Sequence, residues 1–257
     1  MKLAPVAALV FGLALPSWAG AELSDTPLLG LGLRTRPAYD GSASQHGEVV
    51  PVIRWLGQPL FVRSTQGVLE GGLRVELATG LHAGAQLAYE PGRAASESAF
   101  LVSHAINAVD KGASVGAQLE WDQQLGPAPV TLLVRGRRHV DAARGAQADL
   151  RLSVGVFKAG PASAGVFTQA VWASAKSAAA MYEVTPLQSA TSGLPAFKPG
   201  GGWMSASFGG LWSVDLGRDW VAVGNLEWRR LQGDASRSPL VERAWNHAAS
   251  AGLAHRF

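Results

Sequence analysis

The chain has 257 residues and a formal net charge of only +3 at pH 7. Charged residues make up 16% of it, compared with roughly 25% in an average soluble domain. This small charge, without any Lys- or Arg-rich run, argues against nucleic acid as a partner. The absence of cysteine excludes disulfides and thiolate metal sites.

The N-terminus has the three parts of a secretory signal peptide, predicted at residues 1–21. A lysine precedes an apolar run from Leu3 to Leu15, and small residues follow it. We expect cleavage between Ala21 and Glu22, with cleavage after Ala19 as the alternative. The apolar run is shorter than the about 20 residues that a membrane-spanning helix needs, which argues against a membrane anchor.

The mature chain, residues 22–257, is predicted to form one domain built from strands. Polar and apolar residues alternate along it, as in VLEGGLRVELA at 68–78, where Glu70, Arg74 and Glu76 oppose leucines and a valine. Such segments run for about 10 to 13 residues, whereas strands of soluble proteins average about 5 to 6. Strands that cross a membrane need about 9 to 11 residues, so the length favours a membrane barrel over a soluble sandwich.

Twelve candidate strands can be counted, and the connections between them alternate in length. The strands are predicted at 28–36, 47–56, 59–65, 68–78, 81–90, 114–125, 129–139, 147–158, 162–174, 202–215, 219–230 and 245–257. Short joints alternate with long ones, except that the short Gln66-Gly67 joint stands where a long loop is due. The predicted fold is therefore an all-β, antiparallel transmembrane β-barrel of about 12 strands, with short periplasmic turns and longer extracellular loops.

Aromatic residues near the ends of these strands are interpreted as membrane-interface girdles, with ordinary core aromatics as the alternative. Such rings are apolar but keep an N–H or O–H in contact with water. They are Trp55, Tyr89, Trp121, Trp172, Trp220 and Trp228.

Strand residues opposite the apolar face are expected to point into the barrel. There they bring together charges of both signs, at Arg54, Glu70, Arg74, Glu76, Glu120, Arg135, Arg137, Asp149, Arg151, Glu227 and Arg229. Barrels of 8 strands are filled by side chains, while those of 16 to 18 hold channels. Twelve strands lie between these sizes, so the charges could form a structural salt-bridge lattice or line a narrow water path.

Signature motifs for catalysis are thin in the sequence, which has no H-E-x-x-H and no P-loop. Asp40 with His46, or Ser103-His104 with Asp110, could form a pair at the extracellular rim, but their spacing has no specificity. We therefore predict no enzyme activity and no catalytic, cofactor-binding or metal-ligating residues.

Four segments resemble the MipA/OmpV family of outer-membrane proteins, the MltA-interacting proteins. The first is a glycine-rich strand followed by P-x-Y-x-G-S, and the second ends in Y-x-x-G-R. The more specific ones are the loop MYEVTPLQSATSGLPAFKPGGG and the final loop LQGDASRSPLV. The residues that carry the loop motifs are Pro37, Tyr39, Gly41, Pro186, Ser192, Gly193, Leu194 and Pro195.

The resemblance implies an outer-membrane scaffold that joins a lytic transglycosylase to a peptidoglycan synthase. Outer-membrane lipid, lipopolysaccharide and the barrel assembly machinery are the other expected partners. A small-solute channel is the second hypothesis for the function, and a hydrolase at the rim is the third. Pro186, Gly193 and Pro195 are expected to fold a long loop back over the barrel mouth, with ligand binding as the alternative.

The last predicted strand is expected to carry the signal for barrel assembly. Ala251, Leu253 and Phe257 lie on its apolar face, and Phe257 ends the chain. Many outer-membrane barrels have Tyr at the third position from the end, where this chain has His255. We expect a weakened but functional assembly signal.

Overall fold

The computed structural model describes residues 26–257, so the predicted signal peptide and its cleavage site lie outside the described residues. All twelve predicted strands are confirmed. They are β1 (Leu28–Pro37), β2 (Gln45–Leu56), β3 (Leu60–Thr65), β4 (Val68–Ala78), β5 (Leu81–Glu90), β6 (Gly112–Leu125), β7 (Ala128–His139), β8 (Ala146–Ala159), β9 (Ala162–Ala173), β10 (Gly202–Asp215), β11 (Trp220–Leu231) and β12 (Trp245–Arg256).

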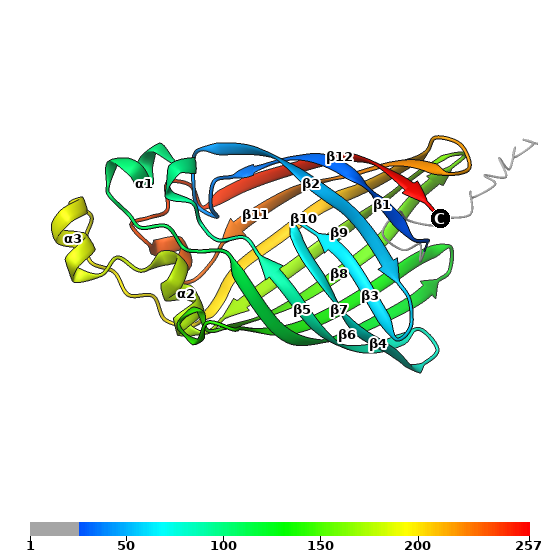
Figure 1. The fold of residues 1–257 in the computed structure, drawn as a ribbon, viewed down its shortest axis with the longest axis horizontal. Helices are drawn as coiled ribbons and strands as arrows, with labels where there is room; N and C mark the ends of the chain where they lie inside the picture. The colour runs from blue at the N-terminus through cyan, green and yellow to red at the C-terminus, as the bar shows by residue number, and fades with distance from the viewer. Residues whose placement is uncertain (1–25) are drawn as a thin grey trace, which may run out of the picture.

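The strands form one closed barrel in which each is antiparallel to its neighbours in the sequence. Pairing of β1 with β12, from Leu28↔Arg256 to Thr35↔Ala249, closes the ring. The helices gather at one end of the barrel, called here the long-loop end, and the C-terminus lies at the opposite, short-turn end (Figure 1). The predicted antiparallel barrel is therefore confirmed.

Short helices occur only in the long loops of the described chain. They are η1 (Ala95–Glu97), α1 (Ala99–Ser103), η2 (Ala142–Arg144), α2 (Ala175–Tyr182), α3 (Pro186–Ser192) and η3 (Ala235–Arg237). Within residues 26–257, none of these helices has the length and hydropathy to cross a membrane.

The two faces of the wall differ as the alternation predicts. In β4, Leu73 and Leu77 are 52% and 61% exposed, whereas Glu70 and Arg74 are 1% and 2% exposed. The apolar side chains thus cover the outside, and the charged ones occupy the interior. This is the inverse of a soluble protein, and it suits a wall surrounded by lipid.

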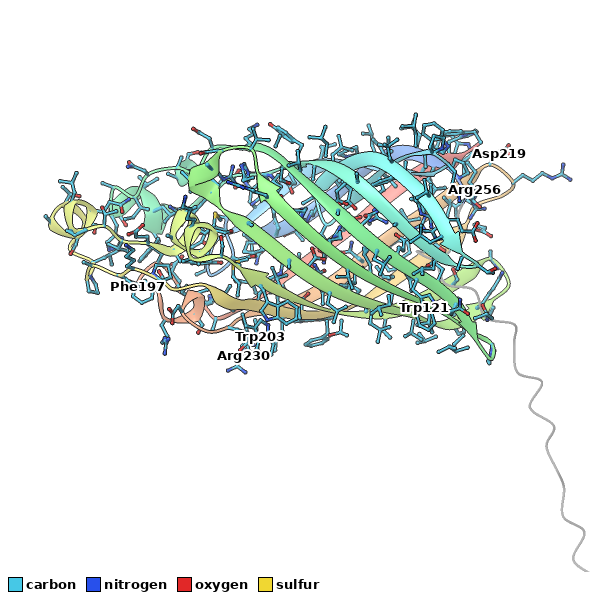
Figure 2. All side chains as sticks on the ribbon, turned by 90° about the horizontal axis from the view of Figure 1, so that it is seen from below. Trp121, Phe197, Trp203, Asp219, Arg230 and Arg256 are labelled. Carbon is cyan, nitrogen blue, oxygen red and sulfur yellow. The ribbon has the colours of Figure 1, made fainter. Side chains whose placement is uncertain are left out.

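Aromatic side chains project outward near both ends of the wall. All six predicted girdle residues are at least 39% exposed, which excludes the alternative of core aromatics. Trp203 and Trp245, which the sequence prediction omitted, are also exposed, and Phe208 stacks on Trp228 with 5.6 Å between ring centroids. Figure 2 shows Trp121 and Trp203 on the outside near opposite ends of the barrel.

Glycine allows close approach of the strands where the ring closes. A Cβ atom on Gly30 of β1 would lie 2.0 Å from the carbonyl oxygen of Leu253 and 2.5 Å from the Cα of Ala254, both in β12. These are backbone atoms that cannot move away without separating the two strands. Gly136 of β7, in contrast, has nothing within 4 Å of the same position.

We expect Gly30→Val to impair ring closure, because the added methyl groups would collide with the β12 backbone. The predicted loss of stability is at least about 1–3 kcal/mol, the usual effect of overpacking. The folded fraction can be measured by the difference in gel migration between unheated and heated samples. Gly136→Val is the matched control, and an equal loss of folded protein in both variants would contradict the proposed role of Gly30.

Candidate functional site

Glu70 lies at the centre of an ion-pair lattice inside the barrel. Its side chain is fully buried, with 0% exposure. Arg63 of β3 contacts one of its carboxylate oxygens, and Nη1 of Arg135 of β7 lies 3.1 Å from both. A buried carboxylate needs such partners because its desolvation is costly. These three residues therefore connect β3, β4 and β7 through the lumen.

The lattice continues on both sides of this centre. Arg63 also binds Glu120 of β6 at 2.7 Å, and Arg74 binds the other oxygen of Glu120 at 3.0 Å. Arg135 donates from Nε and Nη2 to the Asp149 carboxylate of β8 at 2.9 to 3.2 Å. Bidentate guanidinium–carboxylate pairs of this kind are strong and geometrically specific. The lattice thus spans the inner wall from β3 to β8.

A second group of ion pairs lies on the opposite wall. Arg229 of β11 contacts Glu227 at 2.8 Å and Asp40 of the β1–β2 loop at 2.7 Å. Arg34 of β1 is 3.4 Å from Glu48 of β2. Charges of both signs are therefore paired on each side of the lumen.

The other predicted lumen charges occupy less central positions. Arg137 contacts Glu90, the last residue of β5, at 3.2 Å. The guanidinium of Arg151 lies over the ring of Phe167, 4.0 Å from its centroid. Arg54 and Glu76 lie nearer the short-turn end, where Glu76 is exposed.

The sequence prediction omitted several inward charges that contribute to these pairs. They are Arg34, Glu48, Arg63, Glu90 and Asp122. Each has an apolar neighbour on the opposite face of its strand, so the same period of two could have identified them.

The Gln66-Gly67 turn between β3 and β4, called here the hairpin tip, reaches into the lumen. Both residues have positive φ angles, 52° and 81°, as a two-residue type I′ turn requires. Gln66 donates from Nε2 to Glu227 of β11 at 2.9 Å. The guanidinium of Arg34 lies so close to Gly67 that a Cβ there would be 1.9 Å from its Nη1. The joint that broke the alternation of loop lengths is thus a hairpin that ends inside the barrel.

The hairpin tip separates two cavities along the barrel axis. The cavity on the short-turn side has a volume of about 570 Å³, and the one on the long-loop side about 230 Å³. Arg34, Thr65 and Gln66 line both of them. We call them the short-turn cavity and the long-loop cavity.

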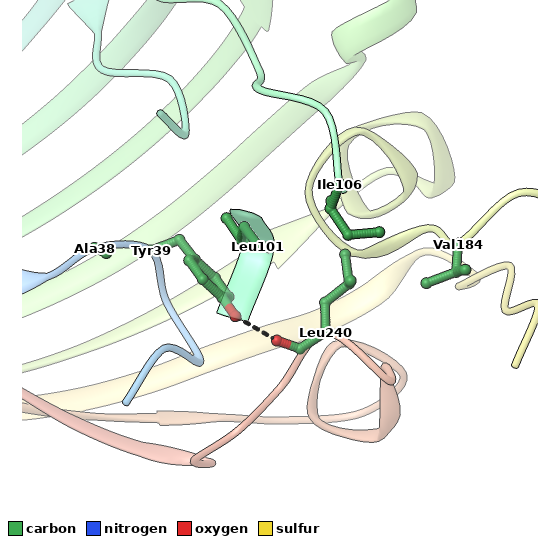
Figure 3. Packing of buried hydrophobic residues seen from close by; sticks show 6 residues of the cluster. All are labelled: Ala38, Tyr39, Leu101, Ile106, Val184 and Leu240. Atoms are coloured by element: carbon green, nitrogen blue, oxygen red, sulfur yellow. Dashed lines mark hydrogen bonds between the residues drawn. The ribbon is translucent and has the colours of Figure 1, made fainter. Parts of the chain in front are cut away.

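The long loops at the other end of the barrel pack around a small hydrophobic core, called here the lid. It contains Ala38, Tyr39, Leu101, Ile106, Val184 and Leu240, contributed by four different loops (Figure 3). The Tyr39 hydroxyl donates to the carbonyl oxygen of Leu240 at 2.7 Å. Burial, followed by the neighbouring Glu242, raises the pKa of Tyr39, so this hydroxyl stays protonated and can donate.

Residues of the loop motifs build this lid. Gly41, which has φ of 107°, donates its N–H to Asn246 at 2.6 Å. Pro186 begins α3 and Gly193 ends it in the left-handed conformation, while Leu194 packs against the lid core. These residues shape the ends of the loops that contribute to the lid. The remaining motif positions are Pro37, the last residue of β1, and Ser192 and Pro195, which flank the turn after α3.

Neither rim pair considered for catalysis is complete, since Asp40 does not contact His46, and Asp110 does not join the contact between Ser103 and His104. Asp40 binds Arg229, while His46 lies 3.6 Å from Glu97. Nδ1 of His104 is 2.9 Å from the carbonyl oxygen of Phe100 and 3.2 Å from the hydroxyl of Ser103. Over residues 26–257 no group of three His, Asp or Glu side chains is arranged to hold a metal ion.

The residues of the predicted assembly signal lie on the outside of the barrel. Ala251 and Leu253 of β12 are exposed, and Phe257 follows the strand with 70% exposure. The rings of His255 and Phe257 stack at 6.3 Å.

A closed barrel with an apolar exterior, aromatic girdles and a charged interior defines an outer-membrane β-barrel protein. A family model described as MltA-interacting protein MipA matches residues 29–257. The chain belongs to this family, and its location is the outer membrane.

Individual relatives are more distant. MltA-interacting proteins of Escherichia coli (strain K12) and Shigella flexneri are 31% identical over 81 residues, which is 30% of this chain and 30% of each relative. The match therefore spans less than a third of the length of these curated relatives. Among solved structures, an outer membrane channel from Pseudomonas putida F1 is similar with a TM-score of 0.50 and 12% identity, over 94% of this chain and 98% of that one. This likeness supports the barrel fold alone.

We expect Glu70→Gln to lower the free energy of unfolding by about 3–5 kcal/mol, because it leaves two buried guanidinium groups without their shared carboxylate. Urea unfolding in lipid vesicles, followed by tryptophan fluorescence, measures this loss. Asp219→Asn, in an exposed turn at the short-turn end, is the control and should change stability by less than about 0.5 kcal/mol. Equal stability of Glu70→Gln and the native chain would mean that the lattice does not stabilise the barrel.

Proposed function

We propose that this protein is a non-enzymatic scaffold of the outer membrane that binds a lytic transglycosylase, and through it a peptidoglycan synthase, at the periplasmic end. The observation that carries the proposal is the closure of the lumen by the lattice, the hairpin tip and the lid. A barrel closed in this way has its short turns as the surface that a periplasmic enzyme can reach. The relatives named MltA-interacting protein support the choice of partner.

The absence of enzyme activity is part of this proposal. The lattice carboxylates Glu70, Glu120 and Asp149 are bound by arginines. The rim histidines contact a glutamate or backbone and hydroxyl oxygens rather than forming a base–nucleophile pair with an orienting acid. The side chains in both places serve to hold the structure together.

The short turns offer a polar surface with a few exposed apolar residues. The β10–β11 turn contains the exposed residues Leu216, Arg218 and Asp219, and the β6–β7 turn begins after the exposed Leu125. Figure 2 shows Asp219 and Arg256 together at this end. A partner enzyme that binds here would contact several turns at once, because adjacent hairpins lie side by side around the rim.

The small-solute channel remains the second candidate, since the two cavities follow one another along the barrel axis. The hairpin tip and the lid stand in the way of a solute in the described conformation. Conduction would require at least one of them to move, so the channel is the weaker proposal.

We expect a lytic transglycosylase to co-purify with the protein after mild crosslinking of intact cells. Arg218→Glu should lower its recovery at least several-fold by reversing a charge on the binding surface. Lys198→Glu is the matched control, because it makes the same charge reversal in an exposed loop at the opposite end. Mass spectrometry of the crosslinked material gives the recovery.

Two results would contradict the proposal. One is purification of the native chain without any murein enzyme. The other is equal recovery from Arg218→Glu and Lys198→Glu, which would remove the evidence for binding at the short turns.

A further inference from the structure

The barrel wall is incompletely paired along one strand. On one side β2 pairs with β1 from Gln45 to Arg54. On the other side it pairs with β3 through Arg54, Trp55 and Leu56 only. In Figure 1, β3 stops midway along the barrel while β2 continues toward the long-loop end. The stretch 45–53 therefore has a neighbouring strand on one side alone.

Unpaired backbone at membrane depth is tolerated only where it is covered by protein or lines a cavity. Pro51 reduces the problem because it has no N–H to pair. Ser64 of β3 supplies a substitute, since its hydroxyl accepts from the N–H of Ile53 at 3.0 Å and donates to the carbonyl of Pro51 at 2.8 Å. Toward the long-loop end, Glu97 of η1 lies 3.6 Å from His46. Between these two contacts Val49 is 68% exposed.

The short-turn cavity reaches this break in the wall. Its lining includes β2 from Val50 to Arg54 and the hairpin from Ser64 to Gly67, the two sides of the break. Its volume of about 570 Å³ lies within the range of about 300–1,000 Å³ that is typical of small-molecule sites. The cavity is thus adjacent both to the periplasmic mouth and to the lipid-facing side of β2.

The lining of this cavity combines apolar and cationic surfaces. Val50, Val52 and Val223, with Gly32 and Gly252, form a smooth apolar side. Charged residues of the lining comprise five arginines and three carboxylates: Arg34, Arg54, Arg63, Arg74, Arg151, Glu76, Glu120 and Asp122. Guanidinium groups beside an apolar surface are complementary to a molecule with an anionic head and an acyl chain.

We propose that the short-turn cavity binds a single-chain anionic amphiphile, such as a long-chain carboxylate, which enters from the membrane between β2 and the β3–β4 hairpin. The acyl chain lies along the valines and glycines, and the carboxylate faces the arginines. The membrane is the source because such chains partition into it, and the unpaired stretch of β2 faces it. This site is independent of any enzyme partner at the short turns.

The direct test uses the full chain in lipid nanodiscs that contain dodecanoate with a photoreactive diazirine on its chain. Mass spectrometry then locates the crosslinked residues. We expect labelling concentrated at 49–53 and 64–68. Labelling spread evenly over the outer apolar residues would overturn the proposal, because it would show ordinary contact with surrounding lipid.

Two substitutions test the cavity itself. Ser250→Phe places a ring in the short-turn cavity from β12 and should lower labelling at least tenfold, whereas Gly136→Phe adds the same ring on the outside and should not. Arg54→Gln should weaken binding of dodecanoate several-fold and leave that of the neutral dodecanol unchanged. Equal effects on both probes would overturn the assignment of an anionic head.

A disulfide across the break keeps the proposal testable if Ser250→Phe does not fold. The chain has no cysteine, so Ile53→Cys with Ser64→Cys would form the only pair. The bond should reduce labelling from the membrane, and reductant should restore it. Leu132→Cys with Leu152→Cys, across the fully paired β7–β8 contact, is the control and should have no effect. Unchanged labelling in the oxidised Ile53/Ser64 pair, or labelling only by probe added from the aqueous phase, would contradict entry from the membrane.

Discussion

The buried carboxylate of Glu70 sets the constraint on which the rest of the barrel interior depends. A wall whose outside is apolar must place its polar residues inside, where each charge requires a partner because water is scarce. Arg63 and Arg135 meet this requirement for Glu70, and their remaining donors bind Glu120 and Asp149. One acidic position in β4 thereby fixes the orientation of side chains on four other strands. Ion pairs therefore connect the strands across the lumen, which is not an open passage.

The hairpin tip and the lid follow from the same arrangement. A longer β3 would complete the wall beside β2. The observed β3 is short and ends at the Gln66-Gly67 turn, where the side-chain amide of Gln66 donates to Glu227. Glu227 in turn holds Arg229, which binds Asp40 in the first long loop. A chain of polar contacts thus connects the lumen to the loop that carries Tyr39 in the lid. The break beside β2 is the structural consequence of turning the hairpin inward.

Much of this architecture could be predicted from the sequence, because a period of two survives wherever one face of a strand meets lipid. The twelve strands and the inward position of Glu70 and Arg135 follow from that period. The period does not show which residues from different strands and loops contact one another in three dimensions. The pairing of Asp40 with Arg229 joins residues that are 189 positions apart, and no local pattern indicates it. The Gln66-Gly67 joint was recognised in the sequence as an exception in loop length. The alternation of polar and apolar residues does not predict that this turn points into the lumen.

Single-channel recording of the native chain in planar lipid bilayers tests the closed lumen most directly. With the lattice, the hairpin tip and the lid in place, we expect a silent bilayer after insertion, with insertion verified independently by protease protection. Stable, repeated conductance steps from the native chain would contradict the closed lumen, because they would show a continuous water path through the barrel.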